Sequence, residues 1–255
     1  MKPVNYNEIS TVYDQRYTSG SRNQPAAALQ QVIDHLQAQS VLEVGCGTGH
    51  WLSLLQRISS MACGLDASAG MLAKARQKSP PLVLTHASAQ ALPFAGESFD
   101  FIYCINALHH FSDPQAFIRE ARRTLHQGGA ISLIGMDPHT GQDQWYLYDY
   151  FPGILETNLA RYPSQAAIST WLQEAGFTRL QYSIADQIND VFQGQQVFND
   201  AILQKNGSSQ LALLSMDDFK TGMARIQQAV EQAIKKEETV TFSTQIALVM
   251  ITGYL

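Results

Sequence analysis

Three glycines at alternate positions and one distant acid are the residues best suited to hold a ligand in this chain of 255 residues. Gly45, Gly47 and Gly49 follow a short apolar run and precede an apolar pattern at i, i+1, i+4 and i+7 that starts at Trp51. Glycine has no Cβ atom, so the turn lets the backbone approach a ligand and directs free N–H groups at it. Asp66 ends the next apolar segment, where an acid at a strand tip binds ribose hydroxyls. This arrangement predicts nucleotide binding.

Parallel strands must bring these residues to one edge of a sheet. The apolar run 41–44 is typical of a buried parallel strand, and helical patterns separate it from four further segments that we predict as strands. These segments are residues 61–66, 82–85, 99–106 and 130–136. Ser68, Asp113 and Ser164 are predicted to cap the helices that follow them. The alternation of strands and helices indicates an α/β fold with a parallel sheet, which binds ligands outside the carboxyl ends of its strands.

The glycine pattern distinguishes between nucleotides. His50 stands where the dinucleotide pattern G-x-G-x-x-G requires its third glycine. The pattern E-x-G-x-G-x-G, from Glu43 to Gly49, instead resembles motif I of the class I S-adenosylmethionine-dependent methyltransferases, and residues 64–68 resemble the ribose motif of that family. The resemblance spans residues 40–136 and is greatest to the ubiquinone-biosynthesis-like small-molecule methyltransferases. Its further blocks are residues 92–94, 98–100, 107–110 and 125–129.

The resemblance implies a Rossmann-like sheet of seven strands with helices on both faces, a last strand that is antiparallel, and a helical lid. We expect one methyltransferase domain over residues 1–255, with a core of about 24–141, 164–187 and 239–255. Residues 142–163 and 188–236 are predicted as lid insertions, and residues 1–23 as an N-terminal cap. Asp217 or Asp218 is predicted to cap a long helix in the second insertion.

The resemblance also implies S-adenosyl-L-methionine as the cofactor and S-adenosyl-L-homocysteine as its product. Asp66 would hold the ribose hydroxyls, and Glu43 would anchor the turn and the amino end of the donor. Ser88 stands where the family usually has an aspartate that accepts a bond from the adenine amine, so this bond should be weaker. The N-terminal tyrosines either close over the cofactor or simply pack a terminal helix. The predicted cofactor-binding residues are Glu43, Gly45, Cys46, Gly47, Gly49, Asp66, Ala67, Met71, Ser88, Ala89, Gln90, Asn106, Tyr17 and Arg22.

The acceptor is expected at the tips of the fourth and fifth strands and under the lid. If the acceptor needs deprotonation, the base is His109, His139 or Asp137, and we name His109 as the candidate catalytic residue. The alternative for the adjacent histidines is a packed loop residue, which suits His110 better than His109. No Asp, Glu or Cys joins them at ligand spacing, so no metal site is predicted. The candidate substrate-binding residues are His109, His110, Asp137, His139, Trp145 and Tyr148.

The aromatic stretch that contains Trp145 and Tyr148 has two further explanations. It is either the core of the lid, or part of a dimer surface that leaves the N-terminal tyrosines to line the pocket. We expect a monomer or a homodimer.

Composition excludes several classes of partner. The net charge is −5 and no basic run is present, so we expect no nucleic-acid partner. Cys46, Cys63 and Cys104 lack paired spacing and lie in apolar segments, as buried thiols do in a reducing compartment. The N-terminus has no apolar leader, and the longest apolar run, 246–251, is too short to span a bilayer. We therefore expect a cytoplasmic protein without a membrane partner.

The predicted function is transfer of a methyl group from S-adenosylmethionine to a small-molecule acceptor by in-line displacement. One alternative is a non-catalytic nucleotide-binding protein that regulates a partner chain. The other alternative is an NAD-dependent oxidoreductase, which His50 disfavours.

Overall fold

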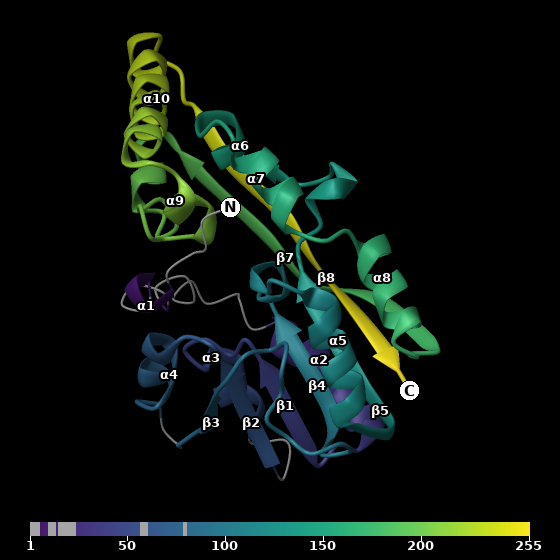
Figure 1. Ribbon diagram of the computed structural model, residues 1–255. Coiled ribbons are helices and arrows are strands. Elements are labelled where there is room, and N and C mark those ends of the chain that lie inside the picture. The colour runs from purple at the N-terminus through teal and green to yellow at the C-terminus, as the bar shows by residue number, and fades with distance from the viewer. Residues whose placement is uncertain (1–5, 10–13, 15–23, 57–60, 79–80) are drawn as a thin grey trace.

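The computed structural model describes residues 6–9, 14, 24–56, 61–78 and 81–255, and within them it forms one mixed sheet of eight strands (Figure 1). β1 to β5 are parallel, and β8 runs antiparallel to β5. β7 and the two-residue β6 also pair with β8 in the antiparallel sense. In the order of the sheet, the strands are β3 (Val83–His86), β2 (Met61–Asp66), β1 (Ser40–Val44), β4 (Phe99–Ile105), β5 (Leu125–Gly135), β8 (Thr241–Tyr254) and β6 (Gln144–Trp145), with β7 (Arg179–Gln193) beside β8.

Helices cover both faces of this sheet, because the central strands are apolar on both sides. Val41 belongs to one hydrophobic core and its neighbour Leu42 to the other. The first core is closed by α2 (Gln24–Leu36) and α3 (His50–Leu55), and the second by α5 (Pro114–Thr124) and α8 (Gln165–Glu174). The predicted α/β fold class, with a Rossmann-like sheet and an antiparallel last strand, is confirmed.

Most of the predicted helix caps are present. Ser68 caps α4 (Ala69–Ala75) by accepting the N–H of Met71, and Asp113 and Ser164 do the same for α5 and α8. The predicted cap of α10 (Met216–Lys235) is wrong, since Ser215 occupies that position and accepts the N–H of Asp218. Asp217 and Asp218 instead lie in the first turn, where their charge still favours the helix dipole.

The β7–β8 ribbon carries the segments that were predicted as a lid, hereafter called the lid. β7 pairs with β8 up to Gln193 opposite Thr241, so it continues beyond residue 187, where we expected the core to end. Figure 1 shows the lid helices along the far part of this ribbon, away from β1, β2 and β3. The lid contains α6 (Tyr146–Tyr150), α7 (Ile154–Arg161), η4 (Gly194–Asn199), α9 (Ser209–Leu213) and α10. The division into core, lid and cap stays a prediction.

The remaining short elements lie near the carboxyl edge of the sheet. They are η2 (Leu108–His110), which follows β4, η3 (Pro138–Thr140), which follows β5, and α1 (Tyr6–Ile9), which contacts α4. In the part of the chain that the structure describes, no helix is long and apolar enough to cross a membrane.

Candidate active site

The glycine turn after β1 folds back onto the end of β2. The N–H groups of Gly45 and Cys46 donate to the carbonyl of Leu65 at 2.8 and 3.0 Å. Gly45 has φ +76°, and a Cβ atom at this position would lie 2.4 Å from the Cβ of Ala107. A side chain therefore fits neither the backbone conformation nor the space, so this part of the turn requires glycine.

Asp66 connects this turn to the end of β2. Its carboxylate accepts the N–H of Gly47 at 2.8 Å and that of Ser68 at 2.7 Å. Burial raises the pKa of this carboxyl, while the N–H groups of Ser68 and Gly47 oppose the shift. Two carboxylate oxygens can accept about four hydrogen bonds, so acceptor capacity remains for a ligand.

Glu43 lies beneath the turn and is only 1% exposed. It accepts the hydroxyl of Tyr103 at 3.2 Å and the backbone N–H of Leu52 in the first turn of α3. Burial raises its pKa well above the ordinary value. These contacts join β1, β4 and α3, so the carboxyl supports the turn from below.

Further residues predicted to bind the cofactor follow β1, β2 and β3. Cys46, Met71 and Ala89 are buried, whereas Ala67 and Ser88 are exposed. The Ser88 hydroxyl donates to the side-chain oxygen of Gln90 at 3.0 Å and accepts the backbone N–H of Gln90 at 3.2 Å. A hydroxyl has two lone pairs, so Ser88 keeps one for a ligand donor.

The N-terminal cap is described at few positions. Tyr17 and Arg22 lie outside the described residues. Asp14 accepts hydrogen bonds from the hydroxyl of Thr48 in the glycine turn and, at 3.2 Å, from the ammonium of Lys78. One point of the N-terminal segment thus contacts the turn.

The tip of β4 presents Asn106 and His109. Asn106 has φ +48°, and its N–H donates to Ile134 at 2.8 Å. The His109 ring stacks on Tyr162 with 3.8 Å between centroids, and its Nε2 is buried without a hydrogen-bond partner among the described residues. Burial, with His110 and Arg161 nearby, lowers the pKa of His109 well below its ordinary value. The imidazole is therefore neutral and weakly basic.

His110 faces other partners. Arg161 contacts its Nδ1 at 2.9 Å, and the Tyr6 hydroxyl contacts its Nε2. A guanidinium only donates, so Nδ1 accepts and the ring proton lies on Nε2 towards Tyr6. His110 thus links α1 to the lid helix α7.

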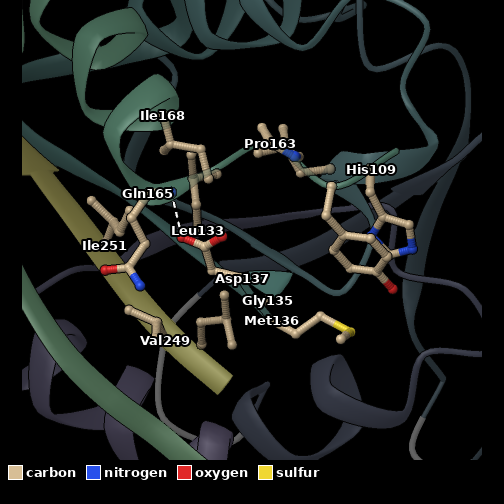
Figure 2. Close-up of a pocket in the computed structure, with 13 residues that line it drawn as sticks. His109, Leu133, Gly135, Met136, Asp137, Pro163, Gln165, Ile168, Val249 and Ile251 are labelled. Carbon is tan, nitrogen blue, oxygen red and sulfur yellow. Dashed lines mark hydrogen bonds between the residues drawn. The ribbon is translucent and has the colours of Figure 1, made fainter. Parts of the chain in front are cut away.

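Asp137 and His139 hold elements together beyond β5. One oxygen of Asp137 accepts the N–H of His139 at 3.0 Å. The other accepts the N–H of Gln165, the first residue of α8, at 2.9 Å, as the dashed line in Figure 2 marks. His139 Nε2 contacts the Tyr162 carbonyl at 2.8 Å, which requires the proton on that nitrogen. Both contacts favour a positioning role over that of a general base.

A cavity of about 150 Å³ lies between the strand tips and the lid. Asn106, His109, His110 and Met136 line it from the strand tips, and Trp145 and Tyr162 from the first insertion. A void of about 30 Å³ beside it shares His109, Met136 and Tyr162 and is drawn in Figure 2.

Tyr148 is not among the residues that line this cavity. Its ring packs edge-on to Trp145 with 5.6 Å between centroids, and its hydroxyl accepts from Asn158 at 3.1 Å. Tyr148 therefore supports Trp145 from behind.

Several polar residues of the cavity were missed in the sequence. They are Asp186 on β7, Thr244 on β8, and the lid residues Ser208, Ser209 and Gln210. The one available signal was the acid at position 186, which interrupts the otherwise uncharged residues 180–189. Among the described residues, no group of three or more His, Cys, Asp or Glu is placed to hold a metal ion.

Known proteins resemble this chain over the same segments. A family model described as a methyltransferase domain matches residues 42–133. The Synechocystis protein named uncharacterized methyltransferase sll0829 is 30% identical over 142 residues, which are 55% of this chain and 67% of the relative. The 2-phytyl-1,4-naphtoquinone methyltransferase of Thermosynechococcus vestitus is 28% identical over 207 residues, 69% of this chain and 90% of the relative.

A solved structure shares the fold. The crystal structure of Bacillus subtilis YcgJ has a TM-score of 0.63 at 20% identity and covers 91% of this chain and 98% of that chain. In sequence, the uncharacterized methyltransferase YcgJ is 32% identical over 150 residues, 56% of this chain and 57% of the relative.

The fold, the glycine turn with its acid, and these relatives define a class I methyltransferase that uses S-adenosylmethionine. The chain belongs to this family, in the group that methylates small molecules. It is an enzyme with S-adenosyl-L-methionine as cofactor, as predicted, so the oxidoreductase and the non-catalytic protein are set aside.

The residues at the turn fit this cofactor. The backbone at Gly45 leaves no room for a Cβ atom, and the Asp66 carboxylate is held by two N–H groups with acceptor capacity left over. The cofactor's part in the chemistry is an electrophilic methyl group on a sulfonium that is also a good leaving group.

Proposed function

We propose that the enzyme methylates a small, partly apolar or aromatic acceptor held in the cavity between the strand tips and the lid. The observation that carries this proposal is that one cavity connects Asn106 and His109, on the donor side, with Trp145 of the first insertion. Apolar pockets with a few placed polar groups are typical sites for such ligands. The name of the Thermosynechococcus relative, which refers to a naphthoquinone, also supports an aromatic acceptor.

The donor side of the proposal rests on the residues around the turn. Asp66 binds the ribose hydroxyls, and the glycines admit the backbone of the donor. Glu43 acts from beneath by holding the turn and α3 in place. The other donor contacts that we propose come from Cys46, Ala67, Met71, Ser88, Ala89, Gln90 and Asn106, with Tyr17 and Arg22 in the cap.

On the acceptor side, the chain contributes alignment and the exclusion of water. The Nε2 atom of His109 is buried in the wall of the cavity with no partner among the described residues. We assign it the hydrogen bond that orients the nucleophilic atom of the acceptor. Because its pKa is lowered well below the ordinary value, His109 is better suited to orienting this atom than to removing a full proton.

Trp145 is the residue on which this proposal is tested. Trp145→Ala removes the indole from the cavity wall, and Trp171→Ala removes one from α8 on the opposite face of the sheet. We expect both variants to bind S-adenosylhomocysteine in calorimetry as the wild type does. Only Trp145→Ala should lose transfer of a radiolabelled methyl group into the small molecules of a cell extract, by about tenfold or more.

Tyr148→Ala should reduce transfer less, since Tyr148 acts through Trp145. Normal methyl transfer by both single variants, Trp145→Ala and Tyr148→Ala, would refute the proposed acceptor site. Failure of the wild type to bind S-adenosylhomocysteine would refute the donor site.

The proposal also covers the cellular location, the class of partner and the oligomeric state of the enzyme. Its three cysteines are free and buried, as in proteins of reducing compartments, which supports a cytoplasmic location. The net charge of −5 supports a partner other than nucleic acid. We propose a monomer or a homodimer.

A further inference from the structure

Asp186 is a buried acid that a β-bulge turns towards the active-site cavity. The register of β7 and β8 shifts between Ile184, opposite Val249, and Asp186, opposite Leu248, so Ala185 is the extra residue. Ala185 belongs to the same core as Leu248, and Asp186 lines the cavity beside Leu248. Two consecutive side chains therefore face one side, which regular alternation forbids and a bulge permits.

The register also places Asp186 at the ligand edge of the sheet. Gly135, the last residue of β5, is opposite Val249, and Val249 is opposite Ile184 on its other side. Asp186 is thus one pair beyond the carboxyl end of β5, the edge at which such sheets bind ligands.

The cavity residues nearest to Asp186 on β7 and β8 are apolar. Asp186 is 4% exposed and stands opposite Leu248, and the next pair along the strands, Ile188 with Ile246, also lines the cavity. Of the described residues that line the cavity, Asp186 is the sole acid, and none is lysine or arginine. A carboxylate can accept about four hydrogen bonds, so a ligand that donates to Asp186 gains a charge-assisted bond.

The sheet gives the distance between Asp186 and the methyl-transfer point. β4, β5, β8 and β7 are consecutive neighbours, and the donor-side residues Asn106 and His109 directly follow β4. Three spacings of about 4.8 Å separate β7 from β4 by about 14 Å. Asp186 therefore lies too far across the sheet to act on the atom that His109 orients.

We propose that Asp186 is a specificity residue that binds the far end of the acceptor. The acceptor is then an elongated molecule with an apolar or aromatic body. It has a nucleophilic atom at the His109 end and a hydrogen-bond donor, hydroxyl or ammonium, at the Asp186 end. This inference rests on the proposed function of the cavity and narrows the class of acceptor that it takes.

The test compares probes that differ only in the distal donor. Tyramine and 4-ethylphenol share a phenol and differ in the ammonium, and 2,6-dihydroxynaphthalene and 2-naphthol differ in the second hydroxyl. Binding to the enzyme saturated with S-adenosylhomocysteine is measured by ligand-observed NMR at millimolar concentrations. We expect the wild type to favour the donor-bearing member of at least one pair by about tenfold or more. The pair that shows the preference identifies the donor as ammonium or hydroxyl.

Two variants assign this preference to Asp186. Asp186→Asn should abolish it, whereas Asp190→Asn should keep it, because Asp190 lies on the same strand outside the cavity wall. The wild-type comparison needs no variant, so it stands even if Asp186→Asn does not fold.

Equal or absent binding of both members of both pairs by the wild type overturns the proposal, as does an unchanged preference in folded Asp186→Asn. If the same protein still binds S-adenosylhomocysteine when either outcome is observed, the inference about Asp186 has failed and the donor site has not.

Discussion

The substitution Gly45→Ala should displace the glycine turn after β1. The new Cβ atom would lie 2.4 Å from the Cβ of Ala107, and an ordinary contact needs about 3.4 Å or more, so one loop must move by about 1 Å. Neither atom can escape by a rotamer change, since both are fixed to the backbone. The left-handed φ of +76° costs about 1 kcal/mol for alanine, and overpacking adds about 1–3 kcal/mol. We therefore expect Gly45→Ala to lose about 2–4 kcal/mol of stability and at least tenfold in affinity for S-adenosylmethionine.

Gly128→Ala is the matched control. Gly128 has φ +83°, but a Cβ atom there meets nothing within 4 Å. This variant should lose about 1 kcal/mol from the backbone alone, and its donor affinity should not change. Urea denaturation gives the two free energies of unfolding, and calorimetry with S-adenosylmethionine gives the two affinities. If Gly45→Ala bound the donor like the wild type and lost no more stability than Gly128→Ala, the packing argument for the turn would be refuted.

Two further predictions concern carboxylates. Asp66→Ala should weaken S-adenosylmethionine binding by about tenfold or more, because a charge-assisted hydrogen bond contributes about 1.5–3 kcal/mol. The control, Asp100→Ala, removes an acid that holds backbone N–H groups at the opposite edge of the sheet, so this variant should lose stability and keep its affinity for S-adenosylmethionine. If calorimetry gave Asp66→Ala and Asp100→Ala the same affinity, the ribose assignment would be contradicted. Burial and the neighbouring Asp137 raise the pKa of Asp143 from 3.8 to about 6, so this carboxyl favours folding below pH 4 and loses that contribution as the pH rises through 6. After allowance for solvent screening, Asp143→Asn should therefore stabilise the enzyme by about 1 kcal/mol at pH 8 and by less at pH 5. An equal gain in the free energy of unfolding at both pH values, measured by urea denaturation, would contradict this.

The spacing of residues in the sequence predicted the donor end of the protein because its signals are local. A turn such as Gly45 to Gly49 works through backbone conformation, and caps such as Ser68 act within one helical turn. The order of strands and helices then fixed the fold class, since parallel strands need crossovers and bind ligands at their carboxyl ends.

The cap of α10 shows where local signals fail. Three neighbouring residues, Ser215, Asp217 and Asp218, are all good caps, and the chain entering the helix decides among them. The sequence pattern predicted a capping residue here and missed its position by two or three residues.

The cavity between the strand tips and the lid was decided by tertiary structure. His109 and Tyr162 stack although 53 positions separate them in the chain, and Asp137 accepts the N–H of Gln165 at the start of α8. The direction of Asp186 depends on a one-residue bulge in the pairing of β7 with β8, and no local pattern specifies that register. The sequence alone thus determined the fold class and the kind of nucleotide that binds. The residues that line the cavity came together only when distant segments packed, because a side chain's neighbours across a cavity depend on strand register and helix packing rather than on spacing along the chain.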